Sequence, residues 1–231
     1  MEISVIVPVL NEELSIVKTL NALAGLQSIS EVIVVDGGST DRTCEIVANF
    51  QKITNLKLVQ MNETGRGRQL HEGTKHARHE IFWFVHADTI PAPNSDVQIK
   101  KYLEASDVAG GNFQIVFDGE GRWAKLLTWL YPYLRIIGLV YGDSAIFVRR
   151  KIYEKIGGFR DFSIFEDVDF FRRANKNGRF VTIKPPVTTS SRRFEKRNFG
   201  WVFMSWMILQ GLYWIGIPAR FLAKYYFPIR K

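Results

Sequence analysis

The stretch EVIVVDGGSTD, residues 31–41, joins a β-branched apolar run to a glycine turn and a candidate helix cap. The run Glu31–Asp36 predicts a buried strand, and Thr40 or Asp41 can cap a helix that extends to Phe50. Two glycines allow a tight turn at the helix N-terminus, which leaves backbone N–H groups facing a ligand. The alternative is an ordinary strand-to-helix turn. Neither the dinucleotide pattern G-x-G-x-x-G nor the phosphate-loop pattern G-K-[ST] occurs in this turn.

Similar strand and helix patterns alternate along the chain on either side of this turn. Apolar runs predict strands over residues 3–9, 56–60, 81–85, 110–117, 145–148 and 180–183, the last ended by Pro185 and Pro186. Helical spacing predicts helices over residues 12–23, 69–78, 123–134, 150–156 and 166–175. Repeated strand–helix units imply an α/β fold, with a mostly parallel sheet and helices on both faces.

The composition is that of a globular protein of one domain, or of one domain with an appendage. The chain has 231 residues, of which 46% are hydrophobic and 23% charged. These values exclude a disordered or collagen-like chain, and the single cysteine, Cys44, excludes an internal disulfide. A reducing, cytoplasmic location is therefore expected. The N-terminus has Glu2 where a signal peptide would have lysines, so no targeting segment is expected.

The net charge of +8 comes entirely from the C-terminal quarter of the chain. Residues 184–231 contain nine Lys or Arg and one Glu, whereas residues 1–183 are neutral. This distribution favours a local anionic partner, either a membrane surface or a phosphate-bearing ligand, over nucleic acid.

The segment Asn198–Ala219 contains no charged residue, and basic residues follow and precede it. Three interpretations stay open: a helix lying at the cytoplasmic face of a membrane, a helix buried on the sheet or in a homodimer, and a membrane span.

Polar residues follow the predicted strands at the edge where ligands of open parallel sheets bind. Pro8, Asn11 and Glu12 follow the first strand, and His86, Ala87 and Asp88 follow the fourth. The Asp88 carboxylate could ligate Mg²⁺ or Mn²⁺ together with ligand phosphates. His86 could bind the metal, contact a ribose or hydrogen-bond to the backbone.

Three further segments carry groups that suit catalysis or phosphate binding. Gly65–Arg68 precedes a helix and offers arginines to a phosphate or a base, unless it is a solvated loop. Glu166 and Asp167 are either helix-capping acids or a general base for an acceptor hydroxyl. Arg192 and Arg193 could clamp a diphosphate or belong to a membrane-facing cluster.

Eight segments, taken in order, resemble family 2 glycosyltransferases over about residues 3–230. They are SVIVPVLNEE, EVIVVDGGSTDRT, GRGRQLHEG, FVHADT, YGDSAIFVRR, GGF, FEDVDFFRR and VTTSSRRFEKR. More narrowly, the chain resembles a small bacterial subgroup with an H-A-D-T metal motif and a V-T-T-S-x-R-R tail. The resemblance implies a GT-A fold, a nucleotide-sugar donor (UDP favoured over GDP), Mn²⁺ or Mg²⁺, and inversion at the anomeric carbon.

The resemblance also assigns roles to residues. Asp167 would be the catalytic base with Glu166 beside it, Asp88 the metal ligand, and Arg192 and Arg193 the diphosphate ligands. The nucleotide would lie against Pro8, Asn11, Glu12, Asp36, Gly38, Asp41, Arg68, His86 and Ala87.

Two departures from the family pattern qualify this assignment. His86 replaces the first acid of the family's D-x-D motif, and the Q-x-x-R-W motif of processive synthases does not occur, so non-processive transfer is expected. The apolar stretch over residues 123–141 and the aromatic C-terminal segment suggest a lipid or lipid-linked acceptor. Its hydroxyl is expected to bind between residues 110–141 and the C-terminal segment.

The expected organisation is a catalytic domain over residues 1–190 and a basic aromatic tail over 191–231. Residues 1–89 form its nucleotide-sugar half and residues 90–190 its acceptor half. One alternative is a nucleotidyltransferase-like enzyme, which needs a glycine-rich loop with a lysine where VPVLNEE stands. The other is a non-catalytic membrane-binding adaptor, which leaves Asp36, Asp88 and Asp167 without a role.

Overall fold

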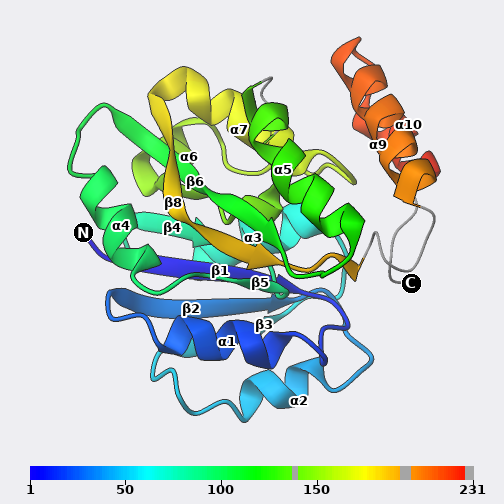
Figure 1. Ribbon diagram of the computed structural model, residues 1–231. Coiled ribbons are helices and arrows are strands. Elements are labelled where there is room, and N and C mark those ends of the chain that lie inside the picture. The colour runs from blue at the N-terminus through cyan, green and yellow to red at the C-terminus, as the bar shows by residue number, and fades with distance from the viewer. Residues whose placement is uncertain (137–139, 193–198, 227–231) are drawn as a thin grey trace.

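The computed structural model describes residues 1–136, 140–192 and 199–226, and its centre is a single sheet (Figure 1). The strands are β1 (Ile3–Val9), β2 (Ile29–Asp36), β3 (Leu56–Gln60), β4 (Ile81–Phe84), β5 (Thr89–Ile90), β6 (Val108–Phe117), β7 (Phe147–Arg149) and β8 (Arg179–Thr189). The longer helices are α1 (Ile16–Ala24), α2 (Thr43–Ala48), α3 (Arg66–His76), α4 (Ser95–Tyr102), α5 (Arg122–Ile136), α6 (Arg150–Lys155), α7 (Glu166–Ala174), α9 (Phe199–Trp214) and α10 (Ala219–Leu222). The strand order is β3-β2-β1-β4-β7-β6-β8-β5.

The first half of the chain forms the parallel part of the sheet, as predicted. β1 pairs in parallel with β2 and β4, and β2 pairs in parallel with β3. Val5 and Val7 belong to a core with α1 and α2, whereas Ile6 and Ile33 belong to a second core with α3. Because successive side chains of a strand point to opposite faces, strands covered on both sides read as continuous apolar runs.

The second half extends the same sheet with mixed strand directions. β7 is antiparallel to β4 and β6, β6 is parallel to β8, and β5 is antiparallel to β8. Since β4 pairs with β7, the proposed nucleotide and acceptor halves share one sheet.

The prediction that Pro185 and Pro186 end the last strand was wrong. β8 continues to Thr189, and the prolines lie where its register against β6 shifts. Phe113 is paired with Ile183 and Ile115 with Val187, so the ladder passes over the prolines, which have no N–H to donate. The continuation matters for the site, because it brings Ser190 and Arg192 to the edge of the sheet where β4 ends.

The C-terminal segment packs only one side of its main helix against the protein. In α9, Leu209 and Gln210 are buried, whereas Trp201, Met204 and Ile208 are exposed. In the parts of the chain that the structure describes, no helix has both the length and the apolar character that crossing a bilayer requires.

Candidate active site

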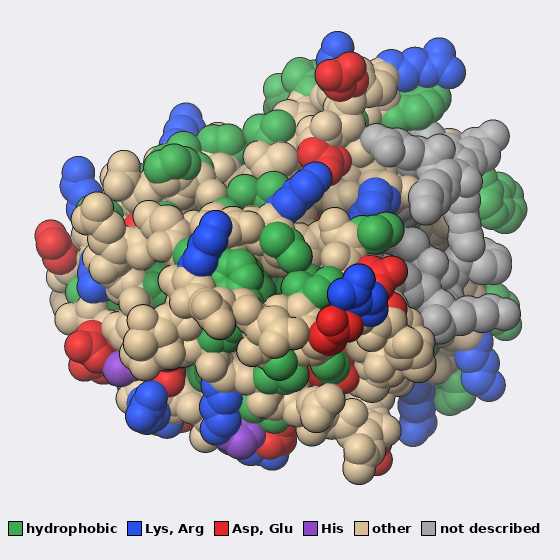
Figure 2. Space-filling view, turned by 90° about the horizontal axis from the view of Figure 1, so that it is seen from below, with side chains coloured by type: hydrophobic (Ala, Val, Ile, Leu, Met, Phe, Trp, Pro, Cys, Tyr) green, Lys and Arg blue, Asp and Glu red, His purple; other side chains and the backbone are tan. Residues whose placement is uncertain are grey.

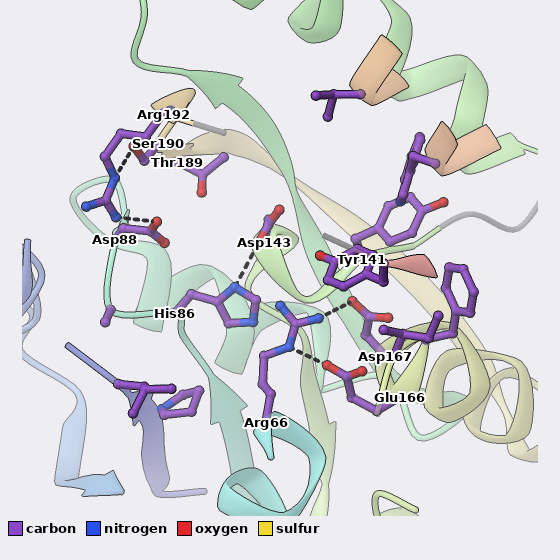
Figure 3. Close-up of a pocket in the computed structure, with 18 of the residues that line it drawn as sticks. Arg66, His86, Asp88, Tyr141, Asp143, Glu166, Asp167, Thr189, Ser190 and Arg192 are labelled. Carbon is purple, nitrogen blue, oxygen red and sulfur yellow. Dashed lines mark hydrogen bonds and ion pairs between the residues drawn. The ribbon is translucent and has the colours of Figure 1, made fainter. Parts of the chain in front are cut away.

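A cavity of about 670 Å³ opens where β1 and β4 end (Figure 3). β1 pairs with β2 on one side and with β4 on the other, so the loops that follow these strands diverge around the cavity. Ligands of open α/β sheets bind at such a switch point. The lining changes from polar groups after β1 and β4 to aromatic and aliphatic groups from α5 and α9.

The loops after β1 and β2 are bonded to each other at the rim of this cavity. The Asn11 amide donates to Ser39 Oγ (2.9 Å), and the Thr40 amide donates to Asn11 Oδ1 (2.8 Å). Asn11 adopts a φ of 53°, a left-handed conformation that asparagine tolerates better than most residues. The structure places Pro8, Asn11 and Glu12 in the lining, where the sequence predicted a nucleoside pocket.

Asp36 supports the turn that follows β2. Its carboxylate is 2% exposed and accepts hydrogen bonds from the Gly38 and Ser39 amides, at 3.1 Å. Gly38 has a φ of 93°, which favours glycine. Asp41 accepts hydrogen bonds from Thr43 and from the Glu13 amide. Asp36, Gly38 and Asp41 thus stabilise the loop from behind, and none of them is among the groups that line the cavity.

The segment after β4 brings His86, Ala87 and Asp88 into the lining. His86 Nδ1 lies 2.7 Å from Asp143 Oδ1, in a single-turn helix over Gly142–Ser144. A Cβ atom at Gly142 would stand 2.6 Å from His86 Nε2, so glycine is needed for this close approach. The contact fixes the imidazole between the polar end of the cavity and Asp167 (Figure 3).

The surroundings of Asp88 fit a divalent cation that also binds a phosphate. Arg192 Nη2 donates to Asp88 Oδ2 (2.8 Å) and lies 3.4 Å from Glu12 Oε2, so a cationic group sits between two carboxylates. Across residues 1–136, 140–192 and 199–226 there is no cluster of three or more His, Cys, Asp or Glu side chains that could hold a metal. The carboxylate oxygens of Asp88 and Glu12 suit Mg²⁺ or Mn²⁺, because these ions bind one or two protein carboxylates and complete their shell with water and substrate phosphates. Arg193 lies outside the described residues.

Asp167 and Glu166 begin α7 on the other side of the cavity, and both are buried. Asp167 Oδ2 accepts a hydrogen bond from the Gly142 amide (2.7 Å), and Oδ1 accepts one from the Val168 amide (2.8 Å). Burial and the neighbouring Glu166 carboxylate raise the pKa of Asp167 to about 6, although Arg66 and the amide donors oppose the shift. A carboxylate with such a pKa is ionised at neutral pH and binds a proton more readily than an ordinary aspartate.

Arg66, which the sequence analysis named only within Gly65–Arg68 and did not assign to the site, supplies a cation beside Glu166 and Asp167. Its Nε donates to Glu166 Oε1, and its Nη2 lies 3.8 Å from Asp167 Oδ2. Burial lowers the pKa of Arg66, but the Glu166 and Asp167 charges outweigh burial and raise it.

Arg68, the predicted nucleotide ligand, points away from the cavity and pairs with Glu63 and Asp161 at the surface. The helix begins at Arg66 and not at Gln69, so Arg66 shares a face with the buried Gln69, Leu70 and Gly73. Had the predicted helix started at Arg66, its periodicity would have put Arg66 on the buried face and Arg68 on the exposed face.

The far end of the cavity is apolar. Tyr131 and Leu134 of α5 face Trp206 and Leu209 of α9 across it. The Tyr141 hydroxyl donates to Gln210 Oε1 (3.2 Å), and the Tyr141 ring lies 4.7 Å from that of Trp206. Burial raises the pKa of Tyr141, so its hydroxyl stays protonated. The cavity therefore has two parts, with Asp167 between them. The charged chamber is lined by Glu12, His86, Asp88 and Arg192, and the aromatic chamber by Tyr131, Tyr141 and Trp206.

Comparison with known proteins agrees with this fold and arrangement. The family model for glycosyl transferase family 2 matches residues 4–179. The probable glycosyltransferase YdaM of Bacillus subtilis is 26% identical over 223 residues, which are 87% of this chain and 53% of the relative. The chain thus spans about half the length of this curated relative.

Two solved structures share the fold at lower identity. Staphylococcus aureus TarS 1–349 in complex with UDP-GlcNAc has a TM-score of 0.67 and 24% identity, over 83% of this chain and 59% of that chain. The mannosyltransferase PcManGT from Pyrobaculum calidifontis, in complex with GDP-Man and Mn²⁺, has a TM-score of 0.68 and 23% identity, over 97% of this chain and 69% of that chain. The family match covers most of the chain, and the two GT-A structures share its fold. This protein therefore belongs to glycosyl transferase family 2.

Proposed function

We propose that this protein transfers a sugar, specifically a hexose, from a nucleoside diphosphate sugar to an acceptor hydroxyl, with inversion and without processivity. The observation that carries the proposal is the buried Asp167 carboxylate, with a pKa raised to about 6, at the junction of a charged and an aromatic chamber. A base in this position suits an acceptor that enters from one side and a donor that enters from the other.

The donor is proposed to occupy the charged chamber. Pro8, Asn11 and Glu12 would line the nucleoside, and Arg192 would bind the diphosphate after leaving Asp88. Asp88 would hold Mn²⁺ or Mg²⁺, which, when bound, neutralises charge on the departing diphosphate. His86, held by Asp143, stands where it can contact the ribose or the metal.

Asp167 is proposed to act directly on the acceptor. Its Oδ2 takes the hydroxyl proton as the acceptor oxygen bonds to the anomeric carbon, and the bond from that carbon to the diphosphate oxygen breaks. Figure 3 places Asp167 on one side of the cavity, and Asp88 and Arg192 on the other. Attack from the side opposite to the leaving group inverts the anomeric configuration. Arg66 holds Glu166 and keeps a positive charge near Asp167 throughout.

The finer assignments rest on the relatives and on the aromatic chamber. We infer a UDP-sugar in preference to a GDP-sugar, because TarS, whose structure is in complex with UDP-GlcNAc, is 40% identical to this chain over 93 residues, whereas PcManGT, in complex with GDP-Man, is 23% identical. The aromatic chamber suits a lipid or lipid-linked acceptor, presented at the cytoplasmic face of a membrane. We further propose that the chain belongs to a small bacterial subgroup of the family, on the basis of its H-A-D-T and V-T-T-S-x-R-R motifs.

The experiment is calorimetric titration of the protein with UDP, GDP and CDP, each with and without Mn²⁺, followed by transfer assays with sugars of the base that binds. Tight binding of one nucleoside diphosphate, weakened without Mn²⁺ or in Asp88→Ala, is expected. Failure of the folded protein to bind any of them would contradict the proposal and favour the adaptor alternative. Binding without transfer, but with exchange of pyrophosphate, would favour a nucleotidyltransferase.

A further inference from the structure

Two helices beside the cavity expose large apolar side chains. In α9, Trp201, Met204 and Ile208 are 69%, 57% and 56% exposed and recur at helical spacing, so they share one side of the helix. We call these three side chains the α9 surface. In α5, Trp129 and Tyr133 are 62% and 53% exposed, but they lie on the side of the helix opposite to Tyr131, which lines the cavity. A row of exposed apolar side chains of this size marks an interaction site in soluble proteins.

The charges of α9 and α10 are all of one sign. Residues 199–226 contain Arg220 and Lys224, and no Asp or Glu. The signs are mixed beside α5, where Glu120 lines a pocket together with Lys125 and Trp129. They are also mixed over the face that Figure 2 shows, where Lys or Arg and Asp or Glu side chains are interspersed. An apolar, aromatic helix accompanied by cations suits the headgroup region of an anionic bilayer.

The α9 surface is continuous with the aromatic chamber. Trp201 and Tyr225 are each 69% exposed, yet both line the cavity, so the cavity has its mouth between them. Deeper in the same cavity lie Trp206 and Leu209, and then Asp167. An apolar path therefore leads from the exposed side of α9 to the carboxylate.

We propose that the α9 surface docks on an anionic lipid bilayer, with the mouth of the cavity against the lipid. A second copy of this chain is a poorer occupant, because a two-fold interface would bring the same cations face to face. The docking itself is independent of the catalytic proposal. Its consequence, that a lipid-borne hydroxyl reaches Asp167 without leaving the membrane, rests on the proposed function.

The test is co-sedimentation with vesicles of phosphatidylcholine alone, or of phosphatidylcholine mixed with phosphatidylglycerol, in the absence of any sugar donor. The wild type is expected to bind the mixed vesicles and to be released by salt. The double substitution Met204→Glu with Ile208→Glu should weaken binding by at least about tenfold, because it places two acids on the apolar row. Val97→Glu is the matched control, since Val97 is 44% exposed on α4, and it should bind as the wild type does.

A second variant separates charge from apolar contact. Arg220→Gln with Lys224→Gln should lose binding to the mixed vesicles in a salt-dependent manner. Circular dichroism and nucleotide titration establish that each variant is folded, and failure to bind nucleotide would contradict the proposed function alone. The docking proposal is overturned if the wild type stays in the supernatant with mixed vesicles, or if both double variants bind as the wild type does. It is also overturned if the wild type is a dimer that Met204→Glu with Ile208→Glu converts to monomer without any vesicle binding.

Discussion

Two buried carboxylates lie at opposite ends of the parallel strands, and their pKa values are shifted in opposite directions. Glu31, near the start of β2, accepts hydrogen bonds from Ser4 Oγ (2.6 Å) and the Arg78 amide (2.7 Å). Burial acts to raise the pKa of Glu31, but these hydrogen bonds and the Arg78 and His79 side chains lower it. Asp167 is also buried, but its pKa is raised, because burial and then the negative charge of Glu166 outweigh Arg66 and the amide donors. The surroundings of Glu31 thus stabilise its ionised form. The surroundings of Asp167 favour its protonated form, so this carboxylate accepts a proton more readily.

The largest expected effect is on transfer by Asp167→Asn. The variant cannot accept the acceptor proton, so kcat should fall by roughly 10²–10⁴-fold. Because the pKa rises from 3.8 to about 6 on folding, the ionised form costs stability as pH rises through that window. The variant should therefore be at least as stable as the wild type at neutral pH, as thermal unfolding can measure. Near-normal transfer by the folded variant would contradict the role of Asp167.

The next effect concerns the charge that Arg66 places beside Asp167. In Arg66→Met the Glu166 and Asp167 charges face each other unopposed, so the pKa of Asp167 should rise further, by about one unit. Transfer by the wild type should fall as pH decreases through about 6, and in the variant this acid limb should move to higher pH. Arg66→Lys keeps the charge and should restore most of the wild-type profile. An unmoved acid limb in Arg66→Met would exclude this coupling.

Glu31→Gln should lower the stability of the fold and leave the rate of transfer unchanged. We expect a loss of about 2 kcal/mol in the free energy of unfolding at neutral pH, because a buried charged acceptor loses its ionic partners. Since the folded pKa of Glu31 is lowered, its contribution is present above its ordinary value of 4.5 and is lost as pH falls further. Urea unfolding across this range should therefore show a smaller pH dependence for the variant. A loss of kcat at neutral pH in the folded variant would contradict the conclusion that Glu31 acts on stability alone.

The smallest effect is expected for Arg68→Ala, which changes the surface arginine of Gly65–Arg68 and serves as a control for the Arg66 variants. Arg68 pairs with Glu63 and Asp161 at the surface, where ion pairs are screened by water and salt. Nucleotide affinity and the thermal midpoint should both stay within experimental error. Weaker nucleotide binding in this variant would restore the role that the sequence predicted for Arg68.

The sequence predicted the buried, regular part of the fold better than the long-range part. β1, β2 and β4 were predictable because strands covered on both faces are apolar throughout. β5 has two residues, and its only signal is its pairing with Thr188 and Thr189, far along the chain. α4 was missed because its buried apolar contribution is confined to Ile99, which gives little helical periodicity.

For the candidate site, the positions after strands were predictable and the directions of side chains were not. Asp88 and Asp167 line one cavity, as their places at the ends of elements suggested. Asp36 lies at the end of its strand too, but its carboxylate turns into its own loop. Asp143 became a partner of His86 only through the pairing of distant segments.

The two-residue strand β5 has a consequence for how such a protein can diverge. Thr89 and Thr189 approach each other with their hydroxyls 3.2 Å apart, immediately next to Asp88 and Ser190. The segment between Ile90 and Thr188, which contributes β6, β7 and most of β8 to the sheet, thus begins and ends at the same point. A change in the length of a loop within that segment can therefore leave the spacing of Asp88 and Arg192 unchanged. A short ladder of this kind lets the loops of the second half vary in evolution while the two groups at the charged end of the cavity keep their spacing.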